Sequence, residues 1–133
     1  MKSLQTSGRR KQAIARAVIS PGKGVVRVNS IVLDNYGTQY QRLRIQEPVM
    51  LADKFAKKLD ISVDVQGGGV TGQTDAVRLA IARALVDHTK SDELKNTFLH
   101  YDRQLLVADV RVKEASKPNS HGKARAKRQK SYR

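Results

Sequence analysis

Three stretches of the chain place alternate residues on opposite faces, which is typical of a β-strand, and a fourth is predicted as a strand because it follows a turn signal. In the clearest of them Ile61, Val63 and Val65 share one face, and the residues between them are polar. Another stretch carries alanines at three alternate positions, small enough to let a helix approach closely. The pattern predicts strands at residues 12–19, 24–28, 61–66 and 104–112.

The first two predicted strands are separated by the sequence Ser20-Pro21-Gly22-Lys23-Gly24. Proline presets φ and glycine permits positive φ, so this segment is typical of a turn. We therefore expect residues 12–19 and 24–28 to pair as an antiparallel hairpin.

Apolar positions at helical spacing predict three helices. The first opens at Glu47-Pro48, because proline is tolerated in a first helical turn, and it carries an apolar stripe toward residue 59. The strongest runs from Thr74 to about His88. A shorter helix covers Ser91 to Leu99, with Ser91 as its N-cap. Residues 34–46 remain ambiguous.

A glycine run between the third predicted strand and the longest helix is the one motif suggestive of phosphate chemistry. Gly67 and Gly72, followed by Gln73-Thr74, nearly reproduce the spacing of a nucleotide-binding P-loop. Gln73, however, stands where a P-loop has its lysine, and a neutral amide cannot offset the charge of the β- and γ-phosphates. The sequence favours a plain strand-to-helix turn or an RNA-phosphate contact over a nucleotide site.

The charge of the chain is the strongest indication of its kind of partner. The chain has 133 residues, enough for one domain, and its formal net charge is +14. Residues 1–58 carry 12 basic and 3 acidic side chains, residues 59–112 carry 6 and 8, and residues 113–133 carry 8 and 1. Two basic ends around a balanced middle are typical of a protein that binds nucleic acid through its arms.

Composition also changes after residue 112. In residues 113–133 only Tyr132 is an apolar side chain larger than alanine, apart from a single proline. Such a segment cannot bury enough surface to offset the entropy of ordering itself. We therefore predict a globular RNA-binding domain at 1–112 and an extended basic tail at 113–133, which reaches at most about 70 Å when stretched.

Several other functions are disfavoured. The chain has no cysteine, so disulfides, thiolate catalysis and cysteine-ligated metals are excluded. The three histidines are scattered, and we expect no catalytic residue, metal site, cofactor or small-molecule substrate. No apolar run is long enough to span a membrane, and the start lacks the apolar core of a signal peptide.

The chain resembles the family of ribosomal small-subunit protein nine from about Ser7 to Arg133. The separated motifs that carry the resemblance occur in the family's order: GRRKQAIARAVI, the turn PGKG, GGGVTGQTDAVRLAIARAL and DRQLLVADVRVKEASKPNSHGKARAKRQKSYR. The ending RQKSYR is similar to the archaeal and eukaryotic branch, and the length is similar to archaeal members.

This resemblance implies an α+β fold: a four-stranded sheet with helices on one face and a left-handed βαβ crossover. It implies a place in the head of the small subunit of the cytoplasmic ribosome, on ribosomal RNA and beside other head proteins, with a tail that reaches the peptidyl-site transfer RNA. Candidates for contact with transfer RNA are Lys130 and Arg133. Candidates for ribosomal RNA are Arg9, Arg10, Lys11, Gly68, Gly69, Lys117, Lys123, Arg125, Lys127 and Arg128.

Three functions therefore compete. The first is a structural RNA-binding protein of the ribosome, the second a nucleotide-binding enzyme built on Gly67 to Thr74, and the third a free-standing nucleic-acid chaperone. The missing lysine disfavours the second, and a folded core with a specific glycine motif disfavours the third, which needs only charge.

Overall fold

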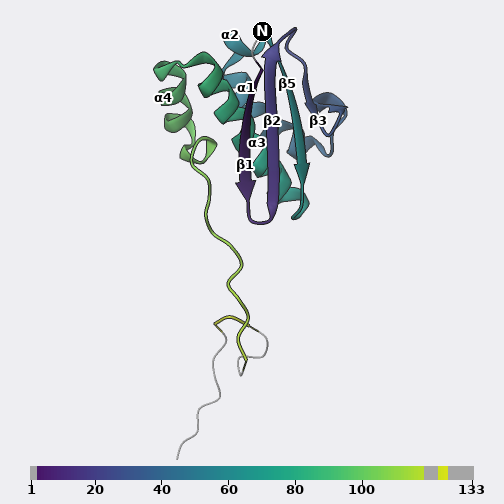
Figure 1. Cartoon of the computed structure of the whole chain (residues 1–133), viewed down its shortest axis with the longest axis vertical. Coiled ribbons are helices and arrows are strands. Elements are labelled where there is room, and N and C mark those ends of the chain that lie inside the picture. The colour runs from purple at the N-terminus through teal and green to yellow at the C-terminus, as the bar shows by residue number, and fades with distance from the viewer. Residues whose placement is uncertain (1–2, 119–122, 126–133) are drawn as a thin grey trace, which may run out of the picture.

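A mixed β-sheet with helices on one of its faces forms the body of the protein in a computed structural model, which describes residues 3–118 and 123–125 (Figure 1). The strands are β1 (Leu4–Arg10), β2 (Ala13–Pro21), β3 (Val26–Val28), β4 (Ile31–Val32) and β5 (Leu59–Gln66). The helices are α1 (Gln39–Leu51), α2 (Asp53–Ala56), α3 (Val70–Thr89) and α4 (Asp92–Tyr101), with 3-10 turns η1 (Leu33–Asn35) and η2 (Arg103–Leu105). The α+β class is confirmed.

The sheet has five strands in the order β1-β2-β5-β3-β4, so the prediction of four was wrong. The sequence did not reveal two of the strands, the short β4 and the longer β1. The residues of β1 between Leu4 and Arg9 are polar or glycine. Antiparallel pairing with β2, from Leu4 opposite Ile19 to Arg10 opposite Ala13, holds this polar strand in the sheet. Polar composition hides a strand whose stability comes from its neighbour.

The predicted hairpin of residues 12–19 and 24–28 is also wrong, because β5 lies between β2 and β3. The turn at 20–25 instead wraps around the start of β5. The Asp60 carboxylate accepts hydrogen bonds from the backbone N–H groups of Val25 and Lys23, at 3.0 and 2.9 Å, and both bonds lower the pKa of Asp60. A local turn signal cannot distinguish adjacent strands from strands separated by a third.

Residues 104–112 form no strand. The chain makes the 3-10 turn η2, buries Leu105, and then leaves the domain with Val110 and Val112 83% and 67% exposed. Alternation was misleading here because a strand also needs backbone pairing with a neighbour, and this segment pairs with no strand of the sheet. The edge strand β1 is instead contacted by α3: the Arg83 guanidinium donates to the carbonyl oxygens of Ser7 and Leu106, at 3.1 and 3.2 Å.

The first helix begins earlier than the predicted Glu47-Pro48 start. Thr38 caps α1 in a capping box with Gln41, and Pro48 lies inside the helix near its end. The prediction took proline as a start signal, but the cap lies ten residues upstream. The predictions for α3, α4 and β5 are confirmed, and Ser91 caps α4 by accepting from the N–H of Leu94 at 3.3 Å.

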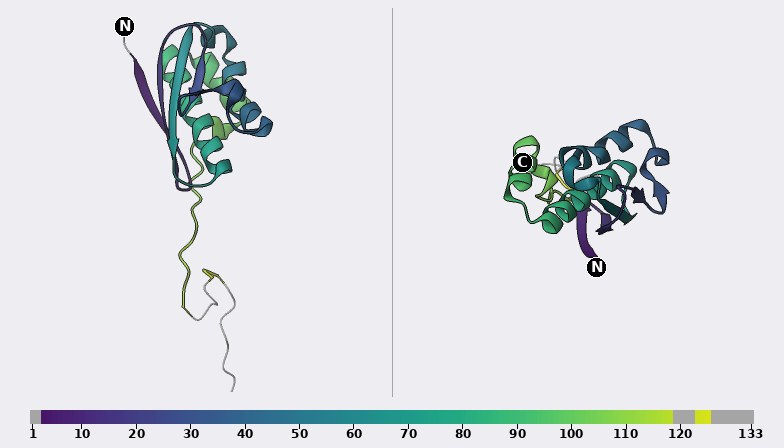
Figure 2. Two further views of the ribbon diagram at one scale, coloured as in Figure 1. Left: turned by 90° about the vertical axis from the view of Figure 1, so that its right-hand side faces the viewer. Right: turned by 90° about the horizontal axis from the view of Figure 1, so that it is seen from above.

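The helices cover one face of the sheet and leave the other open (Figure 2). Ala13, Ala15 and Ala17 of β2 are fully buried on the covered face, and α3 packs on them as their small size predicts. Next to them, a Cβ at Gly8 of β1 would lie 2.5 Å from the carbonyl oxygen of Ala76, so β1 and α3 nearly touch. This close contact places the start of α3 beside the turn between β1 and β2.

The parallel neighbours β3 and β5 are joined through β4, α1 and α2, and the handedness of this crossover stays a prediction. No helix in the described part of the chain is long and apolar enough to cross a membrane.

Candidate nucleic-acid interface

Three segments that the sequence singled out lie together at one end of the domain: the β1–β2 turn, the glycine turn after β5, and the chain as it leaves η2 (Figure 1). A Cβ at Gly67 would lie 2.5 Å from the carbonyl oxygen of Gln12. The Arg10 guanidinium in turn reaches the carbonyl oxygen of Arg111, at 3.4 Å. We call this region, residues 9–13, 67–69 and 109–113, the exit end.

Arg9 and Lys11 are exposed at the exit end. Arg9 is on the open face of the sheet, and its Nε donates to the carbonyl oxygen of Lys11 at 3.2 Å. Lys11 sits at the tip of the β1–β2 turn with φ of 55°, and among the described residues its side chain has no ion-pair partner. Both cations can therefore meet a phosphate without first breaking a contact to a carboxylate.

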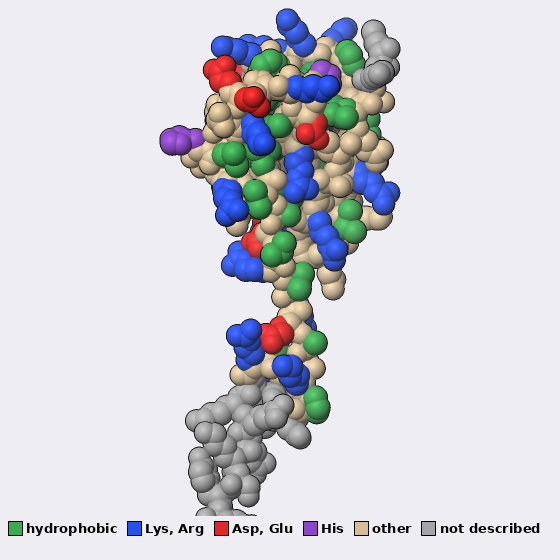
Figure 3. Space-filling view, turned by 60° about the vertical axis from the view of Figure 1, so that its left-hand side comes forward, with side chains coloured by type: hydrophobic (Ala, Val, Ile, Leu, Met, Phe, Trp, Pro, Cys, Tyr) green, Lys and Arg blue, Asp and Glu red, His purple; other side chains and the backbone are tan. Residues whose placement is uncertain are grey.

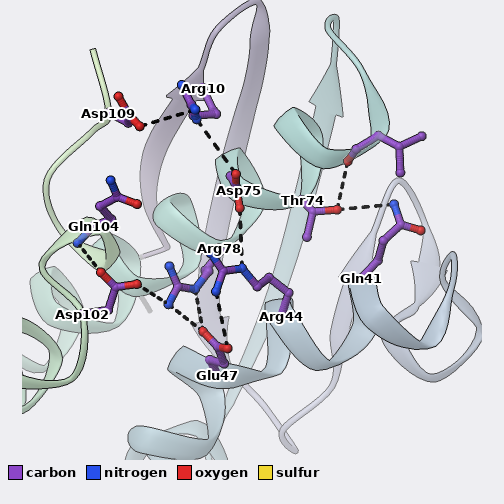
Figure 4. A network of polar contacts seen from close by, with 11 residues as sticks. Arg10, Gln41, Arg44, Glu47, Thr74, Asp75, Arg78, Asp102, Gln104 and Asp109 are labelled. Carbon is purple, nitrogen blue, oxygen red and sulfur yellow. Dashed lines mark hydrogen bonds and ion pairs between the residues drawn. The ribbon is translucent and has the colours of Figure 1, made fainter. Parts of the chain in front are cut away.

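Arg10, the middle member of this cluster, points in the opposite direction. Its side chain is only 17% exposed and lies between Asp75 of α3 and Asp109 beyond η2, at 3.9 and 3.4 Å (Figure 4). The Arg111 side chain and N–H bind Asp109 and, with the charge of Arg10, hold the pKa of Asp109 far below its usual range. The structure thus places Arg10 in an intramolecular ion pair.

The ion pairs continue from Arg10 into the helix layer (Figure 4). Arg44 of α1 joins Asp75 to Glu47, and the buried Arg78 of α3 contacts Glu47 at 2.6 Å and Asp102 at 3.0 Å. Burial acts to raise the pKa of Asp102, but the N–H of Gln104 and the Arg78 guanidinium outweigh it, so that pKa is lowered. The network joins β1, α1, α3, η2 and the departing chain.

The glycine turn presents backbone to solvent rather than a nucleotide pocket. Gly69 is the N-cap of α3, so no side chain caps the helix there, and a Cβ added at Gly69 would meet no atom within 4 Å. Gly68 has φ of +63°, and a Cβ there would lie 2.9 Å from the backbone nitrogen of Ala13, so the turn requires glycine. The Gln73 side chain donates to the carbonyl oxygen of Gly67 at 3.0 Å and closes the loop. Gln73 thus binds its own loop at the position where a P-loop lysine would contact a phosphate.

The segment beyond the exit end carries the remaining described candidates. Lys117, Lys123 and Arg125 are exposed, and both Lys117 and Arg125 pair with Glu114, at 4.0 and 2.6 Å. Figure 3 shows basic side chains around one acidic side chain on this segment. Such exposed pairs are weak, so phosphates can replace Glu114 at little cost. Lys127, Arg128, Lys130 and Arg133 lie outside the described residues.

Comparison with known proteins covers both basic segments. Residues 8–133 match the family described as Ribosomal protein S9/S16. The chain belongs to this family. A small ribosomal subunit protein uS9 of Thermoplasma volcanium is 52% identical over the full length of both chains. Proteins of the same name are 52% identical in Thermoplasma acidophilum, over 96% of this chain and 98% of the relative, and 46% identical in Methanococcus maripaludis, over the full length of both.

Membership in the S9/S16 family decides between the three functions. The protein is a component of the small subunit of the cytoplasmic ribosome, with archaeal relatives, and RNA binding is general to its family. It is not an enzyme, so the glycine turn of this family member is not a catalytic loop.

The sequence did not predict two exposed cations of this S9/S16 protein as candidates for RNA contact. Arg16 of β2 and Arg27 of β3 project from the open face of the sheet, where Arg9 also lies. The strand pairing sets Arg16 opposite Ser7, and Arg9 opposite Ile14, so Arg9 and Arg16 are diagonal neighbours. The alternation of β2 could have revealed Arg16, since it lies on the face opposite the buried alanines. Its proximity to Arg9 depends on β1, which the sequence did not predict.

Proposed function

We propose that the protein binds small-subunit ribosomal RNA through its exit end and through the basic segment that continues from it. The observation that supports this most directly is the convergence of the β1–β2 turn, the glycine turn and the departing chain on one end of the domain. Residues 113–133 carry eight basic side chains and one acidic one. We take residues 1–112 as the RNA-binding domain and residues 113–133 as its extended basic tail.

The chemistry of the exit end suits a phosphate backbone. Lys11 offers a point charge at a turn, and Arg9 offers a planar fork that can bind two phosphate oxygens. The first N–H groups of α3, after Gly68 and Gly69, point out of a helix N-terminus, where an anion is favoured. None of these groups reads a base, so the proposed contact positions the protein on RNA that base pairing has already shaped.

Salt dependence of RNA binding tests this proposal. We would replace Lys123 and Arg125 together by alanine in the full chain, and measure binding to small-subunit ribosomal RNA transcribed in vitro. Each lost phosphate contact should flatten the log–log salt slope by about 0.7–0.9. The matched control replaces two exposed cations, Lys54 in α2 and Lys58 shortly after it. Helix α2 lies at the opposite end of the domain from the exit end (Figure 1).

The control double variant removes the same charge and should change the salt slope less than the tail variant. Equal slopes for the two double variants would mean that RNA responds to net charge alone. That result would contradict a defined interface in the basic tail.

We further propose that the tip of the tail contacts the anticodon stem-loop of the peptidyl-site transfer RNA through Lys130 and Arg133. A guanidinium bound to a backbone phosphate can serve any transfer RNA, because it reads no base. In small subunits that contain Arg133→Ala, filter binding of transfer RNA should be weaker than in unaltered subunits, most visibly at high salt. Equal affinity across salt concentrations, with Lys54→Ala as control, would contradict this contact.

We propose that the βαβ crossover is left-handed. We also propose that the protein contacts neighbouring proteins of the subunit head. Exposed apolar side chains at α1, α2 and α4 support a protein contact away from the exit end, among them Met50 at 69% and Tyr101 at 55% exposure. Cross-linking from Met50→Cys in assembled subunits should capture a head protein, and capture of RNA alone would contradict it.

A further inference from the structure

The chain that leaves the domain has very few polar contacts with it. In the described residues 108–118 and 123–125, hydrogen bonds and ion pairs to the rest of the protein come only from the Arg10 side chain. Its Nη2 lies 3.4 Å from Oδ2 of Asp109, and its Nη1 donates to the carbonyl oxygen of Arg111 at 3.4 Å. One arginine therefore holds both a side chain and the backbone of the departing segment.

Both partners of this contact are well shielded from water. The side chains of Arg10 and Asp109 are 17% and 10% exposed, whereas the apolar neighbour Val110 is 83% exposed. The segment thus turns a carboxylate inward and a valine outward, the reverse of what hydrophobic burial alone would select. An interaction between charges, rather than apolar packing, holds it at this position.

Arg111, two residues further along the chain, holds the Asp109 carboxylate in position for this contact. The Arg111 side chain binds both Asp109 oxygens, with Nη2 2.6 Å from Oδ2, and the Arg111 N–H donates to Oδ1 at 3.1 Å. These bonds form a tight local turn with the carboxylate ionised. On the other side, Asp75 of α3 holds the Arg10 guanidinium in place. The contact therefore joins a preformed turn to a helix in the core.

We propose that the Arg10–Asp109 contact is a latch that sets the direction in which the tail leaves the domain. Arg10 is then a positioning residue for the tail, not a ligand of RNA phosphate. Only the consequence for RNA rests on the proposed function: a tail that starts in a fixed direction loses less conformational entropy when it enters an RNA groove.

The latch can be tested without RNA. The chain has no cysteine, so spin labels can be placed at Ser62→Cys, on the open face of the sheet, and at Ser116→Cys, beyond the latch. Pulsed electron paramagnetic resonance on the full chain then gives the distribution of distances between the labels. We expect a narrow component in the parent protein and its loss in Asp109→Asn, which removes the charge and keeps the shape.

Two comparisons keep the test specific. Asp87→Asn removes an exposed carboxylate near the end of α3 and should leave the distribution narrow. Arg10→Gln should broaden the distribution as Asp109→Asn does, and the double variant should add little, because both changes remove the same contact. Should Arg10→Gln unfold through loss of its contact to Asp75, which circular dichroism would reveal, Asp109→Asn still decides. A distribution unchanged in Asp109→Asn, or broadened equally by Asp87→Asn, would overturn the latch.

An RNA measurement separates the latch from the proposed function. Asp109→Asn and Asp87→Asn raise the net charge equally, so charge alone predicts equal RNA affinities. The latch predicts weaker binding for Asp109→Asn, and equal affinities would overturn its role in directing the tail. Absence of RNA binding by the parent protein would contradict the proposed function and leave the distance result intact.

Discussion

The covered face of β2 and the exit end both contact α3, but through opposite kinds of interaction. At the first, Ala15 and Ala17 let backbone approach backbone, and dispersion and burial hold the layers. At the second, the Arg10 side chain pairs with the Asp75 carboxylate of α3 at 3.9 Å. Close packing fixes the helix layer on the sheet. Ion pairs hold the segment after η2 against the domain at the point where it continues into solvent.

The largest expected effect comes from adding a side chain where β1 and α3 lie closest together, at Gly8. Gly8→Ala puts a Cβ 2.5 Å from the carbonyl oxygen of Ala76 and 2.8 Å from the nitrogen of Ala80, and both are backbone atoms that cannot rotate away. We expect the free energy of unfolding to fall by about 1–3 kcal/mol, measured by urea unfolding.

Gly72→Ala is the matched control for Gly8→Ala. A Cβ at Gly72 would meet its nearest atoms at 3.5 and 3.7 Å, an ordinary contact, in the first turn of α3. Since alanine favours a helix over glycine by up to about 1 kcal/mol, this change should be neutral or stabilising. Equal losses in the two variants would show that β1 and α3 do not approach as closely as described.

A smaller effect is expected from the ion pairs. Asp102→Asn removes one carboxylate from the buried Arg78 and leaves Glu47 as its partner, so we expect a loss of about 1–2 kcal/mol at neutral pH. The folded-state pKa of Asp102 is lowered, so its contribution is present above its ordinary pKa and disappears as the pH falls through the folded value.

Urea unfolding from about pH 7 to about pH 3 checks this dependence. The difference between the parent protein and Asp102→Asn should shrink as the solution becomes acidic. A difference that stays constant over this range would mean that the carboxylate charge does not carry the effect.

The smallest effect is expected in the segment beyond the latch. Glu114→Gln breaks the pairs with Lys117 and Arg125, whose side chains are 54% and 85% exposed. Because exposed pairs contribute little, thermal unfolding should show a change within about 0.5 kcal/mol. A larger loss would mean that residues 114–125 belong to the cooperative unit, and that the contrast between core and exit end is less sharp.

The sequence predicted the exposed cations of the site but not the residues that form ion pairs inside the protein. Exposed Arg9, Lys11 and Lys117 were found because basic residues clustered in sequence are usually solvent-exposed. Arg10 belongs to the same cluster, and no sequence signal distinguishes it from its neighbours. Its environment depends on Asp75 and Asp109, which lie 65 and 99 positions away along the chain and are brought to it by the fold.

Local sequence patterns were enough to predict the strands β2, β3 and β5, the helices α3 and α4, the balanced charge of the middle, and the basic character of both ends. Each of these is a property of residues close together in the chain, where periodicity, capping and charge act locally. The complete fold was needed to show that β5 separates β2 from β3, that polar β1 is a strand, and that residues 104–112 are not. Strand pairing and ion pairing join distant residues, so their outcome depends on which partners the whole fold leaves available.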